Sequence, residues 1–130
     1  MLDKIVLWTY ILIMTWALIF FEDFESEFEP LPLITQNAVF ARLIMLERDG
    51  PSLGRPYADT LIGSKHANMK ELRCTVDNGV WRIAFAFDRE RKAVLLVAGD
   101  KSGVSERRFY RKLIEKADIR FDRHLNKAKG

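Results

Sequence analysis

Two arginines near the middle of the chain have the type and spacing that suit a phosphodiester ligand. Arg73 and Arg82 lie in β-rich runs on either side of Asn78-Gly79. An Asn-Gly pair is the strongest short signal for a two-residue type I′ turn, because both of its residues must take positive φ. In that register the arginines are diagonal neighbours on one face, with Cα atoms roughly 7–8 Å apart. Guanidinium groups placed so closely repel each other unless an anion lies between them, and Arg binds phosphate through a bidentate fork.

The predicted turn also divides the hairpin into two faces, because side chains alternate across a strand. It pairs Arg73 with Ala84, so small side chains leave space beside the arginines. Two interpretations stay open for this face. It forms a shallow cationic platform that binds a phosphodiester, with a carboxylate such as Glu71 or an outside anion between the arginines, or it is a solvated sheet face with ordinary surface arginines. The opposite face, expected in the core, holds Leu72, Cys74, Val76, Trp81, Ile83 and Phe85.

Two side chains outside the hairpin could move a proton. His66 lies in the loop of residues 50–69 that leads into the first strand, and an imidazole can act as general acid or base near neutral pH. The alternative for a loop histidine is a solvated bystander. Tyr110 lies beside the apolar stripe of the last predicted helix, where it packs against the core or stacks on a nucleobase.

Composition points to one compact domain without a metal or disulfide framework. The chain has 130 residues, 48% of them apolar, and a single cysteine, Cys74, which fits a reducing compartment. No phosphate-loop spacing is present, so we expect no nucleotide cofactor. Charge is unevenly distributed: residues 14–34 hold five acidic and no basic side chains, whereas residues 101–130 hold ten basic and four acidic ones. A basic half suggests a polyanionic partner.

The periodicity of the chain predicts an α+β fold. We expect a strand over residues 15–21, helices over 22–31 and 33–48, a short strand at 57–61, the central hairpin, and a strand over 92–98 covered by helices on one side. A basic helix then runs from the N-cap Ser105 to about Leu125. These elements make a small, antiparallel-rich sheet of about four strands, with an N-terminal helical hairpin on one face and a C-terminal basic helix.

Residues 5–21 form an uncharged run that admits three interpretations. Its 17 residues lie at the lower limit for a membrane anchor. A signal peptide is disfavoured, because no small-residue cleavage site follows. We favour a start at Met14, which makes residues 1–13 an N-terminal extension, residues 14–126 the domain and residues 127–130 a basic tail. A membrane is then no partner, and we expect a cytoplasmic protein.

The order of elements and three stretches resemble the RelE/ParE superfamily of type II toxins. The stretches are GRPYADTLIGSKHANMKELR, WRIAFAF and VLLVAGDKSGVSERRFY, and they look like the HigB branch, described as phage-derived. The likeness covers about residues 14–125. It implies a RelE-like fold and supports Met14 as the start of the domain.

The resemblance implies an endoribonuclease that enters the ribosomal A site and cleaves messenger RNA without a metal. In such enzymes the ribose 2′-hydroxyl attacks the adjacent phosphate. Arg73 and Arg82 would hold that phosphate, Lys101 and Lys70 would neutralise its neighbours, and His66 or Tyr110 would carry the proton. We expect further RNA contacts from Lys65, Arg108 and Arg111.

The resemblance also implies a helix-turn-helix antitoxin of the HigA type as partner, besides messenger RNA on the ribosome. The chain lacks the catalytic histidine that some HigB toxins carry near their end, because His124 lies too far along the helix. A second function stays open, that of a ParE-like inhibitor of DNA gyrase without enzymatic activity. We expect replacement of Arg73 and Arg82 by alanine to abolish toxicity and leave the fold intact.

Overall fold

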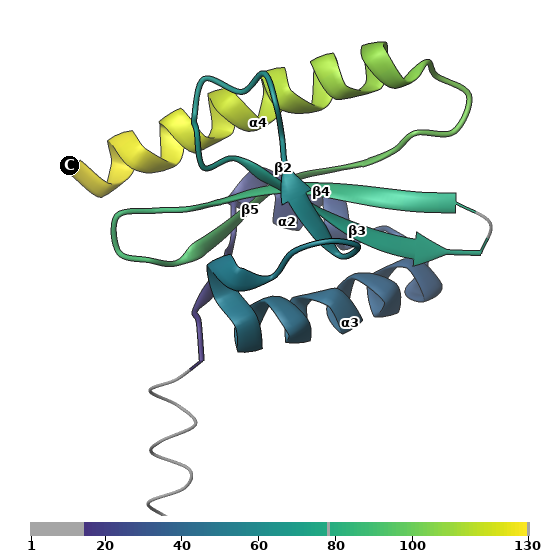
Figure 1. The fold of residues 1–130 in the computed structure, drawn as a ribbon, viewed down its shortest axis with the longest axis horizontal. Helices are drawn as coiled ribbons and strands as arrows, with labels where there is room; N and C mark the ends of the chain where they lie inside the picture. Colours follow the sequence, from purple (N-terminus) through teal and green to yellow (C-terminus); the bar gives the residue numbers. More distant parts are fainter. Residues whose placement is uncertain (1–14, 78, 130) are drawn as a thin grey trace, which may run out of the picture.

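The computed structural model of the chain describes residues 15–77 and 79–129. It has the predicted α+β class, with N-terminal helices and a long C-terminal helix (Figure 1). The elements in chain order are β1 (Leu18–Phe20), α2 (Glu22–Phe28), α3 (Leu33–Asp49), a 3₁₀ turn (Gly50–Ser52), β2 (Ala58–Thr60), β3 (Lys70–Val76), β4 (Gly79–Phe87), β5 (Ala93–Asp100) and α4 (Glu106–Lys129).

The sheet has five strands in the order β1-β5-β4-β3-β2. The total is one more than the expected four or so; the short strand β2 forms within the expected residues 57–61 and pairs with β3 at one edge. β1 runs parallel to β5, and all other neighbouring pairs are antiparallel. The strands β3, β4 and β5 therefore form the body of the sheet, and β1 and β2 are short additions to its edges.

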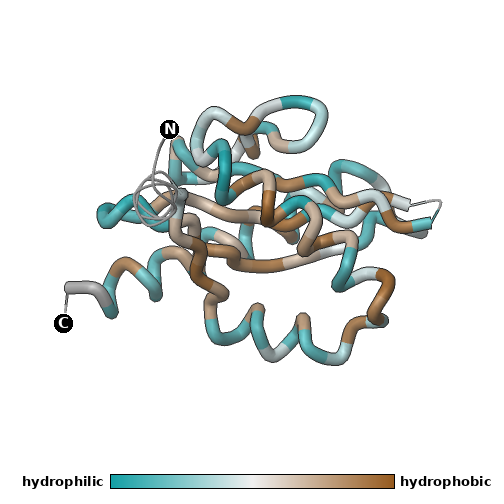
Figure 2. The backbone as a smooth tube through the Cα atoms, turned by 90° about the horizontal axis from the view of Figure 1, so that it is seen from below, coloured by the Kyte–Doolittle hydropathy of each residue, from teal (hydrophilic) through white to brown (hydrophobic). Residues whose placement is uncertain are grey.

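Helices cover both faces of the sheet, with α4 on one side and α2 and α3 on the other (Figure 1). The expectation that residues 92–98 are covered on one side only is therefore wrong. Val94, Leu95 and Leu96 are all fully buried, because α2 and α4 both pack on β5. Hydrophobic colour accordingly runs through the central strands, whereas the helices alternate between hydrophobic and hydrophilic residues (Figure 2).

The predicted helices form close to their expected bounds. Phe24 and Phe28 are the buried side chains of α2, and Pro30 follows its end. α4 begins after Ser105, whose Oγ accepts a hydrogen bond from the Arg108 N–H at 3.3 Å. The helix continues beyond Leu125 to Lys129, so residues 127–129 of the expected tail extend it. Its buried stripe is Phe109, Leu113, Ala117 and Phe121.

The central hairpin turns one residue earlier than Asn78-Gly79, so the predicted pairing is wrong. Val76 pairs with Gly79, and Arg73 pairs directly with Arg82. Asp77 takes the positive φ of 51° that a tight turn needs. Asp tolerates this left-handed conformation because its short polar side chain can hydrogen-bond locally, so Gly79 is free to join β4.

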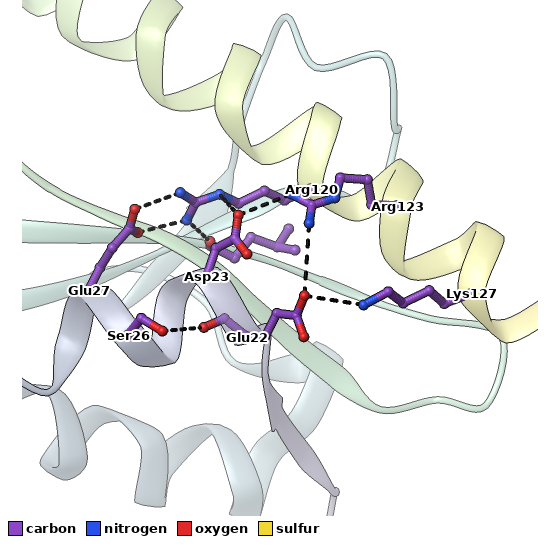
Figure 3. Close-up of polar contacts among 8 residues, drawn as sticks. Glu22, Asp23, Ser26, Glu27, Arg120, Arg123 and Lys127 are labelled. Atoms are coloured by element: carbon purple, nitrogen blue, oxygen red, sulfur yellow. Dashed lines mark hydrogen bonds and ion pairs between the residues drawn. The ribbon is translucent and has the colours of Figure 1, made fainter.

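A paired set of charged side chains ties α2 to α4 (Figure 3). Arg120 is 8% exposed and donates to both carboxylate oxygens of Glu27, at 2.7 and 2.6 Å, and to the Leu96 carbonyl at 2.7 Å. Arg123 donates to Asp23 at 3.0 Å. Part of the uneven charge of the sequence is thus neutralised inside the fold, where the acidic helix meets the basic one.

The apolar run of residues 5–21 lies only partly within the described residues. Residues 15–21 contain β1, which is a strand as expected. The predicted extension of residues 1–13 lies outside the described part. A search of the described residues finds no helix with the length and apolar character needed to cross a membrane.

Candidate functional site

The two arginines that the sequence singles out face each other on neighbouring strands. Arg73 of β3 and Arg82 of β4 are directly paired, so their Cα atoms are closer than the diagonal placement implies. The Arg73 backbone is fixed on both sides, because its N–H donates to the Tyr57 carbonyl at 2.8 Å and its carbonyl accepts from Arg42 Nε at 3.0 Å. The strand pairing therefore positions both guanidinium groups on one face.

A buried carboxylate lies on the same face as the arginines. Glu71 precedes Arg73 by two residues, its side chain is only 3% exposed, and its Oε1 accepts from Arg73 Nε at 2.8 Å. This hydrogen bond raises the pKa of Arg73. Glu71 Oε2 is buried and makes no hydrogen bond of good geometry, alone among the buried side-chain atoms of the described residues, although the Tyr110 hydroxyl lies close enough to interact with this carboxylate. An unsatisfied carboxylate oxygen is costly in a fold, so its presence beside two arginines suggests a functional role.

Helix α4 brings a phenol to the second arginine. Arg82 Nε donates to the Tyr110 hydroxyl at 2.7 Å, and the guanidinium carbon lies 5.7 Å from the ring centroids of both Tyr110 and Phe109. Burial raises the pKa of Tyr110, and the neighbouring Glu71 carboxylate raises it further. The hydroxyl therefore keeps its proton through the neutral range and can donate it.

The arginine face is not the open platform that the sequence suggested. Ala84 and Ala86, expected to leave space there, are fully buried, because α4 packs on β4 and β5. Gly99 of β5 marks the closest approach, since an added Cβ would lie 2.8 Å from the Phe109 ring. Arg73 keeps 38% of its side chain exposed. The face is a partly covered site at the beginning of α4.

Other basic side chains border this site. Lys101 and Arg82 line one hollow of about 350 Å³, and among the described residues the ion pair of Lys101 is the long one to Glu106, at 3.9 Å. Arg111 lines a second hollow, of about 590 Å³, together with Tyr110 and Arg107. The predicted residues Arg73, Arg82, Lys101, Tyr110 and Arg111 thus lie around one region of the surface.

His66 lies elsewhere, close to the C-terminal half of α4. Its Nε2 is 2.8 Å from Asp122 Oδ1, and its ring packs edge-on against Phe121. Residue 121 follows Tyr110 by eleven positions on the helix, about 16 Å along the axis. The expected role of His66 as proton carrier therefore receives no support from its position.

Three predicted RNA contacts also lie apart from the arginine pair. Lys70 is on the face of β3 that Leu72 shares, and its Nζ donates to the Pro51 carbonyl at 3.0 Å. Lys65 forms an ion pair with Asp122. Arg108 is exposed on the first turn of α4. These side chains can meet a long polyanion, but they do not converge on Arg73 and Arg82.

Sequence reasoning gave Glu71 only the role of a possible partner for the arginines. Its spacing from Arg73 was a usable signal, because residues two apart on a strand share a face. The burial of Glu71 could not be predicted from the sequence, since it depends on how α4 crosses the sheet. Asp59 lies on the edge strand β2, with its Oδ2 3.9 Å from Arg73 Nη2. Nothing in the sequence pattern indicated that Asp59 would lie near the site.

A family model supplies the independent comparison. Residues 26–122 match the family described as "Phage derived protein Gp49-like". The chain belongs to this Gp49-like family. The match runs from the end of α2 through most of α4, and it includes all the residues placed around the site.

Curated relatives of this Gp49-like chain include two candidate toxins of Mycobacterium tuberculosis. HigB2 is 46% identical over 92 residues, which are 70% of this chain and 45% of HigB2, so the match spans less than half of that relative. HigB3 is 39% identical over 114 residues, which are 88% of this chain and 97% of HigB3. The resemblance to HigB-type toxins is thereby confirmed. No solved structure matches the chain significantly.

Proposed function

We propose that this Gp49-like protein is the toxin of a toxin–antitoxin system and acts as a ribosome-dependent messenger RNA endoribonuclease. Membership of the family and the names of its relatives support the toxin role. One observation carries the nuclease role: a buried carboxylate with one poorly satisfied oxygen shares a sheet face with two paired arginines, and α4 places a phenol against them.

Glu71 is the general base in this proposal. Because Glu71 Oε2 is covered in the free chain, the proposal requires substrate binding to move the side chains above it; Oε2 then accepts the proton of the ribose 2′-hydroxyl while O2′ attacks the adjacent phosphorus. The bond between phosphorus and the 5′-oxygen then breaks, which leaves a 2′,3′-cyclic phosphate on the upstream fragment. Arg73 holds Glu71 in place through Oε1 and leaves Oε2 for the substrate.

Tyr110 is the general acid in place of His66. The leaving 5′-oxygen needs a proton, and the Tyr110 hydroxyl carries one at neutral pH because the pKa of a phenol lies well above this range. The Arg82 hydrogen bond to the hydroxyl stabilises the phenolate that forms on transfer. A later proton exchange with water restores the phenol.

The arginines and Lys101 stabilise the charge that develops on the phosphate. Arg82 and the exposed part of Arg73 lie on the face where the phosphate is expected, and Lys101 lines the adjoining hollow. Fixed cations act most strongly where water is partly excluded, as beneath the first turns of α4. Lys65, Lys70, Arg108 and Arg111 would meet flanking nucleotides or ribosomal RNA.

An antitoxin of the HigA type completes the proposed system. It would bind this chain in the cytoplasm and keep it from messenger RNA on the ribosome. The proposed reaction draws its acid, base and positive charge from the side chains named above.

Purified chain mixed with translating ribosomes and one defined message tests the nuclease role. The proposal expects cleavage within the translated region, and a loss of about 100-fold or more in rate for Arg82→Gln. Arg82 suits the test better than the pair of alanines suggested by the sequence, because losing Arg73 would leave the buried Glu71 charge without a partner. Intact message together with inhibited supercoiling by DNA gyrase would favour the ParE-like alternative.

A further inference from the structure

The outer edge of β5 is only half occupied. β1 pairs with Ala93, Val94 and Leu95 and then ends. Leu96 is an extra residue, because Phe85 pairs with Leu95 and Ala84 with Val97, and its carbonyl is bound by Arg120. From Val97 to Asp100 no strand of the described residues lies on this side. An open edge of this kind offers backbone hydrogen bonds to another strand.

Two hollows flank the open half of β5, one on each face of the sheet. The first, of about 450 Å³, lies towards α4 and is lined by Phe109, Leu113 and Ile119. The second, of about 270 Å³, lies towards α2 and is lined by Phe24 and Phe28. Val97 and Ala98 line both. Successive side chains of a strand point to opposite faces, so an added strand would place them alternately into the two hollows.

A row of basic residues on α4 runs beside this edge. Spacings of four, four, three and four residues keep the row on one helix face. Its second half is matched by the acids of α2, as in the ion pair between Lys127 and Glu22 (Figure 3). Its first half, Lys112 and Lys116, has no ion pair within the described residues and lines the first hollow. The row consists of Lys112, Lys116, Arg120, Arg123 and Lys127.

The chain itself demonstrates what fits on this edge. β1 presents Leu18, Ile19 and Phe20 along the first half of β5, and Glu22 and Asp23 follow within three residues. Those two acids meet Lys127 and Arg123 on α4. An apolar strand followed by acids is therefore the pattern that satisfies both the strand edge and the basic row.

We propose that the open half of β5, residues 97–100, binds an extended segment of a partner protein with the same pattern. The segment would add a sixth strand, place apolar side chains in the two hollows, and set its acidic residues on Lys112 and Lys116. Within the proposed toxin–antitoxin system the antitoxin is that partner. The inference rests on the antitoxin partner alone, so it is independent of whether the chain cleaves RNA.

The test is a nuclear magnetic resonance titration of the full ¹⁵N-labelled chain with a blocked peptide, Thr-Leu-Ile-Val-Thr-Glu-Asp, up to millimolar concentration. We expect the amide signals of residues 97–100 to shift and those of residues 93–95 to stay, because β1 already covers the latter. Lys112→Glu should weaken binding about tenfold, because it places like charges together. Arg89→Glu, an equal charge change in the exposed turn before β5, should leave binding unchanged.

Three results would overturn the inference. The first is the absence of shifts at residues 97–100 at the highest peptide concentration. The second is equal binding of a peptide that ends in Lys-Lys, which would show that the basic row plays no part. The third is a concentration-dependent dimer that buries this edge, measured by sedimentation of the free chain, because a second copy would then be the occupant.

Discussion

At the scale of single residues, Glu71 connects the fold to the proposed chemistry. A carboxylate this deeply buried requires a charged partner, and Arg73 supplies one to a single oxygen. The other oxygen lies beside the residues that would hold a phosphate. Structural needs alone would favour full pairing or an apolar side chain at this position.

Glu71→Gln should remove cleavage and keep the fold. The amide has the same shape but cannot take a proton, so we expect the cleavage rate to fall about 100-fold or more. The free energy of unfolding should change by about 1 kcal/mol or less, because the lost ion pair is offset by removal of a buried charge. Cleavage on ribosomes and urea unfolding measure the two quantities. Asp59→Asn, which alters the other carboxylate near Arg73, is the control and should keep most activity.

Tyr110→Phe removes the proposed acid and keeps the ring. We expect a fall of about 100-fold in the cleavage rate, because the leaving oxygen must then take its proton from water. Tyr57→Phe is the matched control, since Tyr57 packs against Arg42 outside the site. A Tyr110→Phe variant that cleaves at the original rate would assign the acid to another group.

Several residue placements could be predicted because strands have a period of two. The misplaced turn moved every pairing by two residues, which left Arg73 and Arg82 on one face. The position of His66 could not be predicted in this way. It depends on where the loop of residues 61–68 packs against α4. Asp118 and Asp122 of the helix hold the loop in that position.

At the scale of elements, α4 is held to the sheet by more than its apolar stripe. Arg120 bridges the carboxylate of Glu27 on α2 and the extra residue Leu96 of β5. Tyr110 is in the first turns of the same helix. The contacts of Arg120 in the second half of α4 therefore also help to fix the position of Tyr110 at the site.

Arg120→Ala should destabilise the protein far more than Arg123→Ala. The first leaves the Leu96 carbonyl unpaired and Glu27 without its main partner, so we expect a loss of about 3 kcal/mol in the free energy of unfolding. Arg123 is 46% exposed and pairs with Asp23 at the surface, so its loss should cost about 1 kcal/mol or less. Urea unfolding of the full chain measures both, and equal values would contradict this assignment.

The helices and strands could be predicted from the sequence, but the way they pack against one another could not. Apolar spacing and prolines predicted the helices, and β-branched runs predicted the strands. The apolar run of residues 93–98 indicated a buried strand, yet the pattern could not show that helices cover both of its faces. The short strand β2 lies within the expected residues 57–61, but three residues are too few for a periodic signal to define its bounds, which the edge of β3 sets.

At the scale of the whole molecule, paired carboxylates should make stability depend on pH in the acid range. Hydrogen bonds from Arg120 and Lys65 lower the pKa of Glu27 and of Asp122, respectively. Burial raises the pKa of Asp88, but hydrogen bonds from His124 and two backbone N–H groups lower it overall. Each pKa is thus lower in the folded chain than in the unfolded one.

The free energy of unfolding should therefore fall as the solution is acidified. Below the ordinary pKa values of about 4 the unfolded chain takes up protons that the folded chain resists, so stability is full above that range and is lost from about pH 5 downwards. Urea unfolding at a series of pH values measures this. Glu27→Gln should flatten the dependence, and a stability that rises on acidification would contradict the lowered pKa values.

The most direct test of the proposed function is to map the 5′ ends of cellular messenger RNA after brief induction of the chain. For the original sequence we predict new 5′ ends inside translated regions, at the position of the ribosomal A site. Induction of Glu71→Gln to the same protein level should produce none. Unchanged 5′ ends in cells that stop growing, or identical ends with the Glu71→Gln variant, would contradict a nuclease built around Glu71, Arg82 and Tyr110.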